Sequence, residues 1–520
     1  MQALETATFR AERSAGVRRK LDTRVIPWAW AIGVISYLDR TNLAFASVSL
    51  ARDLEFDCAT YGVASGLFFL GYGACQLPSV WMFHRFGVPW LVATIFVWGA
   101  VAMGFAAVKT RASFYVLRVV LGAVEAGTYP TILAYLSWFY DERSVGTAYS
   151  MAATSTALAS VVGSPIAAGI LFLMDGIWGF AGWQWLFMIE GGLSCSFGMW
   201  LWAFLPRGIE DVGLREEETR WWRRTMGTMG TMGTMGTMGT TGTTGTTGAM
   251  NTANTTNTVK TNVIMSWRPH YLGCVFALVL LSMYGCVFFI PLLINSFLAH
   301  STTSVYGKEQ TSSACEATGD AGNEGGSVNV AAVLLSAIPF SLAAIAMILV
   351  GKSSERMGER RFHGSVSVLF GAVMMGGLAA AIALGAPAAV NIVLLSLSAA
   401  GVWGVHGPLV SYPYQFLEKE EASAAFAVTN SWGALGGFAG PALLGSLTQA
   451  TGSYAVSLGV LAAGAGVAAV MMYMFRPPKV SAVVEGGGLG SDEGSDSHDG
   501  SRHATTAADD TALLLAMREM

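Results

Sequence analysis

Long apolar stretches recur along the chain, each close to the roughly 20 residues that a helix needs to cross a bilayer. Short polar segments separate them, and the stretches fall into two groups of six. The first group covers residues 25–50, 61–83, 90–108, 113–139, 146–174 and 184–205. The second group covers residues 270–298, 328–350, 365–384, 388–412, 422–447 and 454–475. This pattern predicts an all-α membrane protein with twelve transmembrane helices in two six-helix, pseudo-symmetric halves.

The two groups predict the domain organisation. The halves span residues 25–205 and 268–475, between polar tails at 1–24 and 476–520. The segment between the halves, residues 206–267, changes into threonine, methionine and glycine triplets, which are typical of a low-complexity linker. Its basic and aromatic run at residues 220–224 is expected to be a solvated stub, with a helix on the membrane surface as the alternative.

Composition narrows the function classes. Of 520 residues, 53% are hydrophobic and only 12% are charged, whereas about a quarter are charged in soluble domains. The net charge of -4 and the absence of a basic, aromatic-interleaved run exclude a nucleic-acid partner. No catalytic, cofactor or metal constellation is present, so we expect neither an enzyme nor a bound metal. Cys58 and Cys315 lie in predicted outer loops, and both are expected to be free thiols.

The basic residues predict the orientation. Arg52, Lys109, Arg111 and Lys308 would face outward if both termini were cytoplasmic. Arg40 and Arg118 lie within spans, so the other 24 of the 30 Lys and Arg residues would face the cytoplasm. This imbalance follows the positive-inside rule. Residues 510–515 resemble an acidic dileucine signal, so the plasma membrane and an endosomal or vacuolar membrane both stay open.

Four charged residues fall inside the predicted spans, where an ionisable group is costly and usually functional. Arg118 and Glu125 are seven residues apart and therefore share one face of the fourth helix, with Gly122 between them allowing close approach. Asp39 and Arg40 are adjacent and diverge by about 100° around the first helix. The alternative is a set of ion pairs that merely neutralise one another.

These residue types suit anion transport coupled to a proton. Arginine presents a planar fork that fits a carboxylate or phosphate, which makes Arg40 and Arg118 candidate anion ligands. Asp39 and Glu125 can instead change protonation, because a carboxyl whose arginine leaves to bind substrate can take up a proton. Glu190 is a third candidate acid, with packing as its alternative role. His406, in the tenth span, fits a packing residue better than a proton relay.

Four separated segments resemble one known family. They are the residues YLDRTN at 37–42, RVVLGAVEAG at 118–127, GWQWLFMIEGG at 182–192 and GGFAGPALLG at 436–445. The chain is similar in these motifs to the anion:cation symporter family of the major facilitator superfamily. The resemblance implies two six-helix halves around a central site, worked by alternating access.

The resemblance also carries roles to particular positions of this sequence. It implies proton coupling at Asp39 and Glu125 and anion binding at Arg40 and Arg118. It also implies substrate contacts at two further positions, Tyr72 and Asn430.

A second superfamily pattern, G-x-x-x-D-R-x-G, follows the second helix of each half and implies a cytoplasmic gate. The first half keeps Arg85 but has Val80 and His84 in place of the glycine and the acid. The second half keeps both Glu355 and Arg356. The repeated spacing also indicates an internal repeat.

The sequence therefore predicts a secondary active transporter that couples a proton to a small organic anion, a carboxylate. It would act as a monomer in the lipid bilayer and without a cofactor. Inorganic phosphate uptake, sodium coupling, facilitated uniport and a non-transporting nutrient receptor remain as alternatives.

Overall fold

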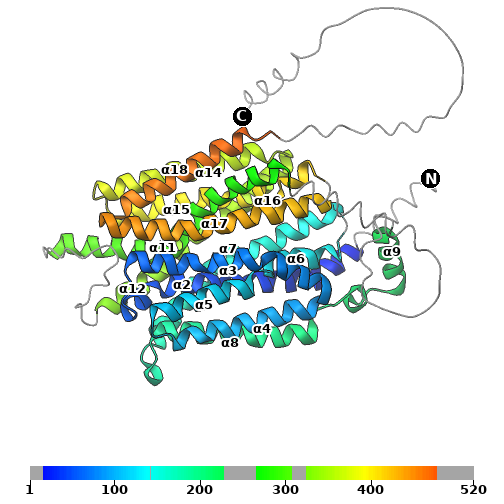
Figure 1. The fold of residues 1–520 in the computed structure, drawn as a ribbon, viewed down its shortest axis with the longest axis horizontal. Coiled ribbons are helices and arrows are strands. Elements are labelled where there is room, and N and C mark those ends of the chain that lie inside the picture. Colours follow the sequence, from blue (N-terminus) through cyan, green and yellow to red (C-terminus); the bar gives the residue numbers. More distant parts are fainter. Residues whose placement is uncertain (1–15, 141, 228–264, 307–323, 418, 477–520) are drawn as a thin grey trace, which may run out of the picture. The chain divides into compact units, whose positions relative to one another are not determined.

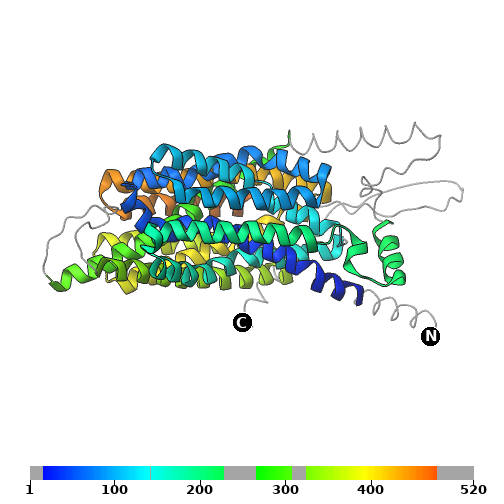
Figure 2. The same ribbon diagram turned by 90° about the horizontal axis from the view of Figure 1, so that it is seen from below.

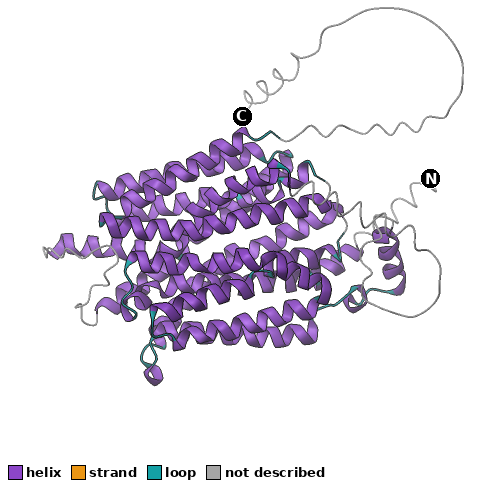
Figure 3. Ribbon diagram, in the orientation of Figure 1, coloured by secondary structure: helices purple, strands orange, loops and turns teal. Residues whose placement is uncertain are grey.

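The computed structural model describes residues 16–140, 142–227, 265–306, 324–417 and 419–476. Helices make up nearly all of this described part, which contains no strand (Figure 3). Each of the twelve predicted ranges contains helix, which confirms the all-α prediction. Nine helical segments in the described residues are long and apolar enough to cross a membrane.

The first half contains seven helices that fill six predicted ranges. They are α2 (Ile26–Asp53), α3 (Cys58–Phe86), α4 (Val88–Gly104), α5 (Arg111–Glu125), α6 (Thr128–Ser137), α7 (Glu142–Leu173) and α8 (Gly182–Phe204). The second half follows the same plan. Its helices are α11 (Trp267–Tyr306), α12 (Glu324–Leu335), α13 (Ala337–Met357), α14 (Arg361–Ala383), α15 (Ala388–Gly404), α16 (His406–Ser411), α17 (Lys419–Thr451) and α18 (Tyr454–Met474).

Three predicted spans are broken into two helices, and a proline explains each break. The breaks fall between α5 and α6, between α12 and α13, and between α15 and α16. Pro130, Pro339 and Pro408 each lie three or four residues beyond the break. A proline lacks the N–H that would bond to the carbonyl four residues earlier, and its ring clashes with that carbonyl.

The two halves repeat one packing scheme. In the first half α2 packs on α7, α3 on α5, and α4 on α8. In the second half α11 packs on α17, α13 on α15, and α14 on α18, which are the corresponding pairs (Figure 1). The halves meet through α3 with α17, α7 with α13, and α2 with α11. Figure 2 shows the bundle from below, with its long helices running alongside one another.

The beginning of the linker folds against the first half. It forms the short helix η3 (Ile209–Val212) and α9 (Glu216–Gly227), whose Trp222 Nε1 donates a hydrogen bond to the Phe139 carbonyl at 3.0 Å. Lys20 Nζ lies 2.7 Å from the Glu218 carboxylate, and this hydrogen bond lowers the pKa of Glu218. Within residues 220–224 the three arginines are exposed, as a solvated segment requires, whereas Trp222 packs onto the bundle.

Cysteine chemistry also differs from expectation at one position. Cys58 is disulfide-bonded, so the prediction of a free thiol there is wrong. The prediction for Cys315 lies outside the described residues. The other four cysteines of the described residues are free thiols, namely Cys75, Cys195, Cys274 and Cys286.

Close packing of α3 on α5 depends on a missing side chain. A Cβ atom at Gly122 would overlap the carbonyl oxygen of Phe68. Because the obstacle is backbone, it cannot rotate away, so only glycine permits this approach. Small residues bring membrane helices together in the same manner. The sequence expectation of close approach at Gly122 is confirmed, and α3 is the helix that approaches.

Replacing Gly122 with Ala should separate α3 from α5 and destabilise the protein by about 1 to 3 kcal/mol, the usual cost of overpacking. Thermal unfolding of the purified variant in detergent measures the effect. Gly466→Ala is the matched control, because a Cβ there meets nothing within 4 Å. Equal unfolding temperatures for the two variants would show that the close contact does not restrict this position.

Candidate functional site

The four charged residues of α2 and α5 lie in the interior of the bundle. Asp39 is 1% exposed, and Arg118 and Glu125 are both 0% exposed. The Arg40 side chain is 11% exposed. Such burial leaves little water to solvate the charges, so the direct contacts of each group decide its energy.

Arg40 and Glu125 form a buried ion pair. Arg40 Nη2 lies 2.5 Å from Glu125 Oε1, and the Ser36 hydroxyl donates to the same oxygen at 2.8 Å. Glu125 Oε2 has no hydrogen-bond partner among the described residues. Helix α2 thus supplies two donors to one oxygen of a carboxylate on α5, and the second oxygen is available to another donor.

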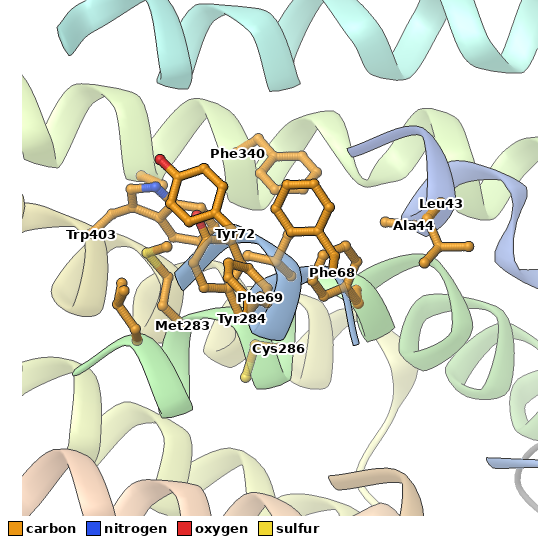
Figure 4. Close-up of a cluster of buried hydrophobic side chains, with 14 of the residues drawn as sticks. Leu43, Ala44, Phe68, Phe69, Tyr72, Met283, Tyr284, Cys286, Phe340 and Trp403 are labelled. Atoms are coloured by element: carbon orange, nitrogen blue, oxygen red, sulfur yellow. The ribbon is translucent and has the colours of Figure 1, made fainter. Parts of the chain in front are cut away.

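Arg40 also connects the two halves. Its Nη1 donates a hydrogen bond to the Tyr284 hydroxyl of α11 at 3.2 Å. Its Cζ lies 5.0 Å from the ring centres of both Phe68 and Tyr72, within cation–π range. Figure 4 shows Phe68, Phe69 and Tyr72 beside Tyr284. An arginine that reaches both halves can respond to their relative position.

Arg118 contacts the same aromatic ring. Its Cζ lies 5.1 Å from the Phe68 ring centre, and its Nε and Nη2 donate to the Ala64 and Ser65 carbonyls of α3 at 3.2 Å each. Its Nη1 has no partner among the described residues. Two guanidinium groups therefore contact the Phe68 ring, and only the one on Arg40 has a carboxylate within ion-pair distance among the described residues.

Asp39 forms no ion pair with the adjacent Arg40. Both of its carboxylate oxygens lack a hydrogen-bond partner in the described residues. Asp39, Glu125 and Glu190 are thus all buried acids, and of the three only Glu125 forms an ion pair among the described residues.

The remaining predicted residues divide into two groups. Tyr72 lies in the site, through its ring contact with Arg40. Asn430 is half-buried on α17, and His406 lies on α16 with its ring centre 6.0 Å from that of Phe276. The predicted gate residues Arg85, Glu355 and Arg356 are exposed and form no ion pair with another described residue. Their gating role stays a prediction.

Sequence reasoning missed three contributors to the site. Ser36 lies one helical turn before Arg40 on α2, a spacing that could have pointed to it. Tyr284 and Phe68 carry no comparable signal, because the sequence does not show that α11 and α3 bring these side chains next to Arg40. No group of three potential metal-ligating side chains occurs in the described residues.

Two helical halves with matching packing, and charged groups buried beside their contact, are the arrangement of a polytopic membrane transport protein. The sequence profile of the Major Facilitator Superfamily matches residues 29–441, and the chain belongs to this superfamily. The prediction of a major facilitator fold is therefore confirmed.

Relatives and a solved structure agree with this assignment. A protein of Agrobacterium vitis named for tartrate transport is 29% identical over 443 residues, covering 85% of this chain and 87% of its own. A quinolone resistance transporter of Acinetobacter baumannii is 28% identical over 447 residues, covering 85% and 91%. The partially occluded, inward-open xylose transporter XylE of Escherichia coli has a TM-score of 0.62 at 15% identity, covering 88% and 98%. This structural likeness supports the fold alone.

Proposed function

We propose that this transporter couples the movement of a proton to that of a small organic anion, a carboxylate. One observation carries the proposal. Arg40 and Arg118 both lie within cation–π range of the Phe68 ring, yet only Glu125 lies within ion-pair distance of either guanidinium among the described residues. A substrate carboxylate complements this surplus of donors.

Competition for Arg40 would link the anion to the proton. The arriving carboxylate takes the guanidinium donors that Glu125 now holds. Glu125 is then an uncompensated carboxylate in a buried site, which costs several kcal/mol. Binding a proton removes this cost. The loaded carrier holds one anion and one proton, and neither is bound in the state with the Arg40–Glu125 ion pair.

The contacts of Arg40 would also link binding to alternating access. The same guanidinium reaches Tyr284 of the second half, so an anion that moves Arg40 changes a contact between the halves. Tyr72 would line the substrate site, and Asn430 would approach from α17. We assign Arg85, Glu355 and Arg356 to a gate at the cytoplasmic ends of the helices, with both chain termini on that side of the membrane.

The proposed carboxylate class has support from outside the site. Two proteins of Agrobacterium vitis, 29% and 28% identical to this chain, are named for tartrate transport. The buried aromatic rings around the guanidiniums supply apolar surface for a carbon skeleton, which inorganic phosphate lacks. An organic anion therefore fits the site better than phosphate does.

Arg118→Ala should abolish measurable anion binding. Losing a charge-assisted contact in a buried site costs about 2 to 5 kcal/mol, which is roughly 30-fold to several thousand-fold in affinity. Arg118→Lys should restore only part, because an ammonium cannot copy the planar fork. Isothermal titration with carboxylates measures the effect. The control is Arg220→Ala, which removes an exposed arginine side chain of α9. Wild-type affinity in a folded Arg118→Ala protein would remove Arg118 from the site.

Glu125→Gln should separate exchange from coupling. Glutamine keeps the shape of a protonated glutamate but cannot release a proton. The variant should exchange labelled for unlabelled anion across proteoliposomes, since exchange needs only the loaded carrier to reorient. It should not accumulate anion when a proton gradient is imposed, because the empty carrier cannot return deprotonated.

Paired exchange and gradient-driven uptake of the same preparation make this test quantitative. Accumulation at the wild-type level in Glu125→Gln would exclude this residue as the coupling acid. Accumulation driven by a sodium gradient alone would show that sodium, and not the proton, is the coupling ion. Flux without accumulation in the wild type would favour facilitated uniport, and binding without flux would favour a receptor.

A further inference from the structure

The connection between α7 and α8 exposes a group of large apolar side chains. We call residues 172–180 the α7–α8 tip. It contains the end of α7, the short helix η2 (Ile177–Gly179) and the approach to α8. Trp178 is 83% exposed, and the other exposed large apolar residues of the tip are Phe172, Leu173, Ile177 and Phe180. A concentration of exposed apolar area of this kind marks a contact surface.

Hydrogen bonds within the tip hold its backbone in one conformation. Four of its backbone N–H groups bond to carbonyls of residues 174–180, namely those of Gly176, Ile177, Gly179 and Phe180. A backbone that satisfies its own polar groups can leave water at little cost, which is what a low-dielectric environment requires.

Trp185 of α8 supports the tip from within the fold. Its Nε1 donates a hydrogen bond to the Ile177 carbonyl at 3.1 Å. Its ring centre lies 5.4 Å from that of Trp178 and 6.0 Å from that of Phe180. The exposed rings of the tip are therefore held in place by a neighbouring ring.

Trp178 has an unfavourable backbone conformation. Its φ of 56° and ψ of 21° lie in the left-handed region, where a bulky residue is an outlier. Glycine adopts this region readily, so the backbone alone would favour glycine at this position. An indole kept at such a position indicates a role beyond local packing.

Charge places the tip at a particular depth. Asp175 is the only charged residue from 144 to 189, and its Oδ1 accepts a hydrogen bond from the Gly182 N–H at 2.8 Å. A carboxylate is costly in the hydrocarbon core of a bilayer. The tip therefore suits the boundary between headgroups and acyl chains.

The exposed face of α7 leads directly to the tip. Residues 154–173 are long and apolar enough to cross a membrane. Val162, Ile166 and Leu173 are exposed and share one face of this helix, as a lipid-facing surface requires. The tip lies at the end of the bundle opposite α9, because α8 runs from the tip toward the segment that forms α9 (Figure 1).

We propose that the α7–α8 tip is an interfacial anchor, which inserts into the boundary between the headgroups and the acyl chains of the bilayer. The indole of Trp178 suits this boundary, because its ring is apolar and its N–H can bond to a headgroup oxygen. The other exposed apolar residues of the tip enter the upper acyl chains, and Asp175 stays at the level of the headgroups. The anchor holds the connected ends of α7 and α8 at one depth in the membrane.

Spin labelling tests the proposal in lipid nanodiscs that hold one copy of the full chain. The four free thiols are replaced by alanine, and a nitroxide is attached at Ile177→Cys, beside the intact Trp178. Its collisions with oxygen, which concentrates in lipid, should exceed its collisions with a water-soluble nickel complex. Val162→Cys on the exposed face of α7 gives the lipid reference, and Arg220→Cys on α9 gives the water reference.

Trp178→Gly, added to the labelled protein, should shift the label toward the water reference. The variant should fold, because glycine adopts the left-handed conformation readily. An unchanged collision profile in Trp178→Gly would contradict the anchor. Nickel collisions that match the Arg220 reference would place the tip in water, available to a soluble partner. Protection from both reagents only in discs with two copies would assign the tip to a contact between copies of this chain.

Proteolysis provides a second test with all native cysteines in place. Chymotrypsin cleaves after aromatic residues, and the tip should resist it in nanodiscs. Phe172→Ser combined with Leu173→Ser should raise the tip out of the lipid and speed cleavage at Trp178 by about tenfold or more, since cleavage follows the accessible population. The control combines Val456→Ser with Val460→Ser, at exposed positions of α18. Equal cleavage rates in the two double variants would overturn the proposal.

Discussion

The ion pair between Arg40 and Glu125 constrains the rest of this molecule, because neither charge can be left alone in the interior. Its 2.5 Å separation links α2 to α5, and the remaining donors of Arg40 extend the network to Tyr284 of α11. A buried ion pair stabilises a fold weakly but makes loss of one partner costly. Because losing one partner is costly, an anion that displaces Glu125 from Arg40 favours proton binding by Glu125. The same displacement changes the contact between the halves.

Packing makes this arrangement possible. The absence of a side chain at Gly122 lets α5 approach α3, and Arg118 can then donate to the Ala64 and Ser65 carbonyls. The Phe68 ring, from the same turn of α3, lies within cation–π range of both guanidiniums. Backbone carbonyls and an aromatic face therefore hold Arg118 in a buried position while one N–H group remains unpartnered among the described residues.

Hydropathy predicted the helices because crossing a bilayer demands long apolar runs, and helical periodicity predicted that Asp39 diverges from Arg40. Local patterns of this kind could not identify the partner of Arg40. The choice among Glu125, Asp39 and Glu190 depends on how α2, α5 and α8 face one another, and hydropathy does not fix that rotation. Tyr284 was missed for a related reason, since it comes from the opposite half.

Two local features were misjudged or overlooked at the sequence level. The arginines of the run at residues 220–224 are exposed, as its charge predicts, but the hydrogen bond from Trp222 to the Phe139 carbonyl, just beyond α6, was overlooked. The three breaks within predicted spans could have been predicted from the sequence. Pro130, Pro339 and Pro408 each lack the N–H that would bond to the carbonyl four residues earlier, where the helix is interrupted.

The central claim is that an anion displaces Glu125 from Arg40 and that Glu125 then binds a proton. Proton uptake on anion binding measures this directly, with the detergent-purified protein in a weakly buffered solution and a pH-sensitive dye. The account predicts that the wild type takes up about one proton for each anion bound, and that Glu125→Gln binds the anion without uptake. Anion binding by the wild type without proton uptake, or equal uptake by Glu125→Gln, would contradict it.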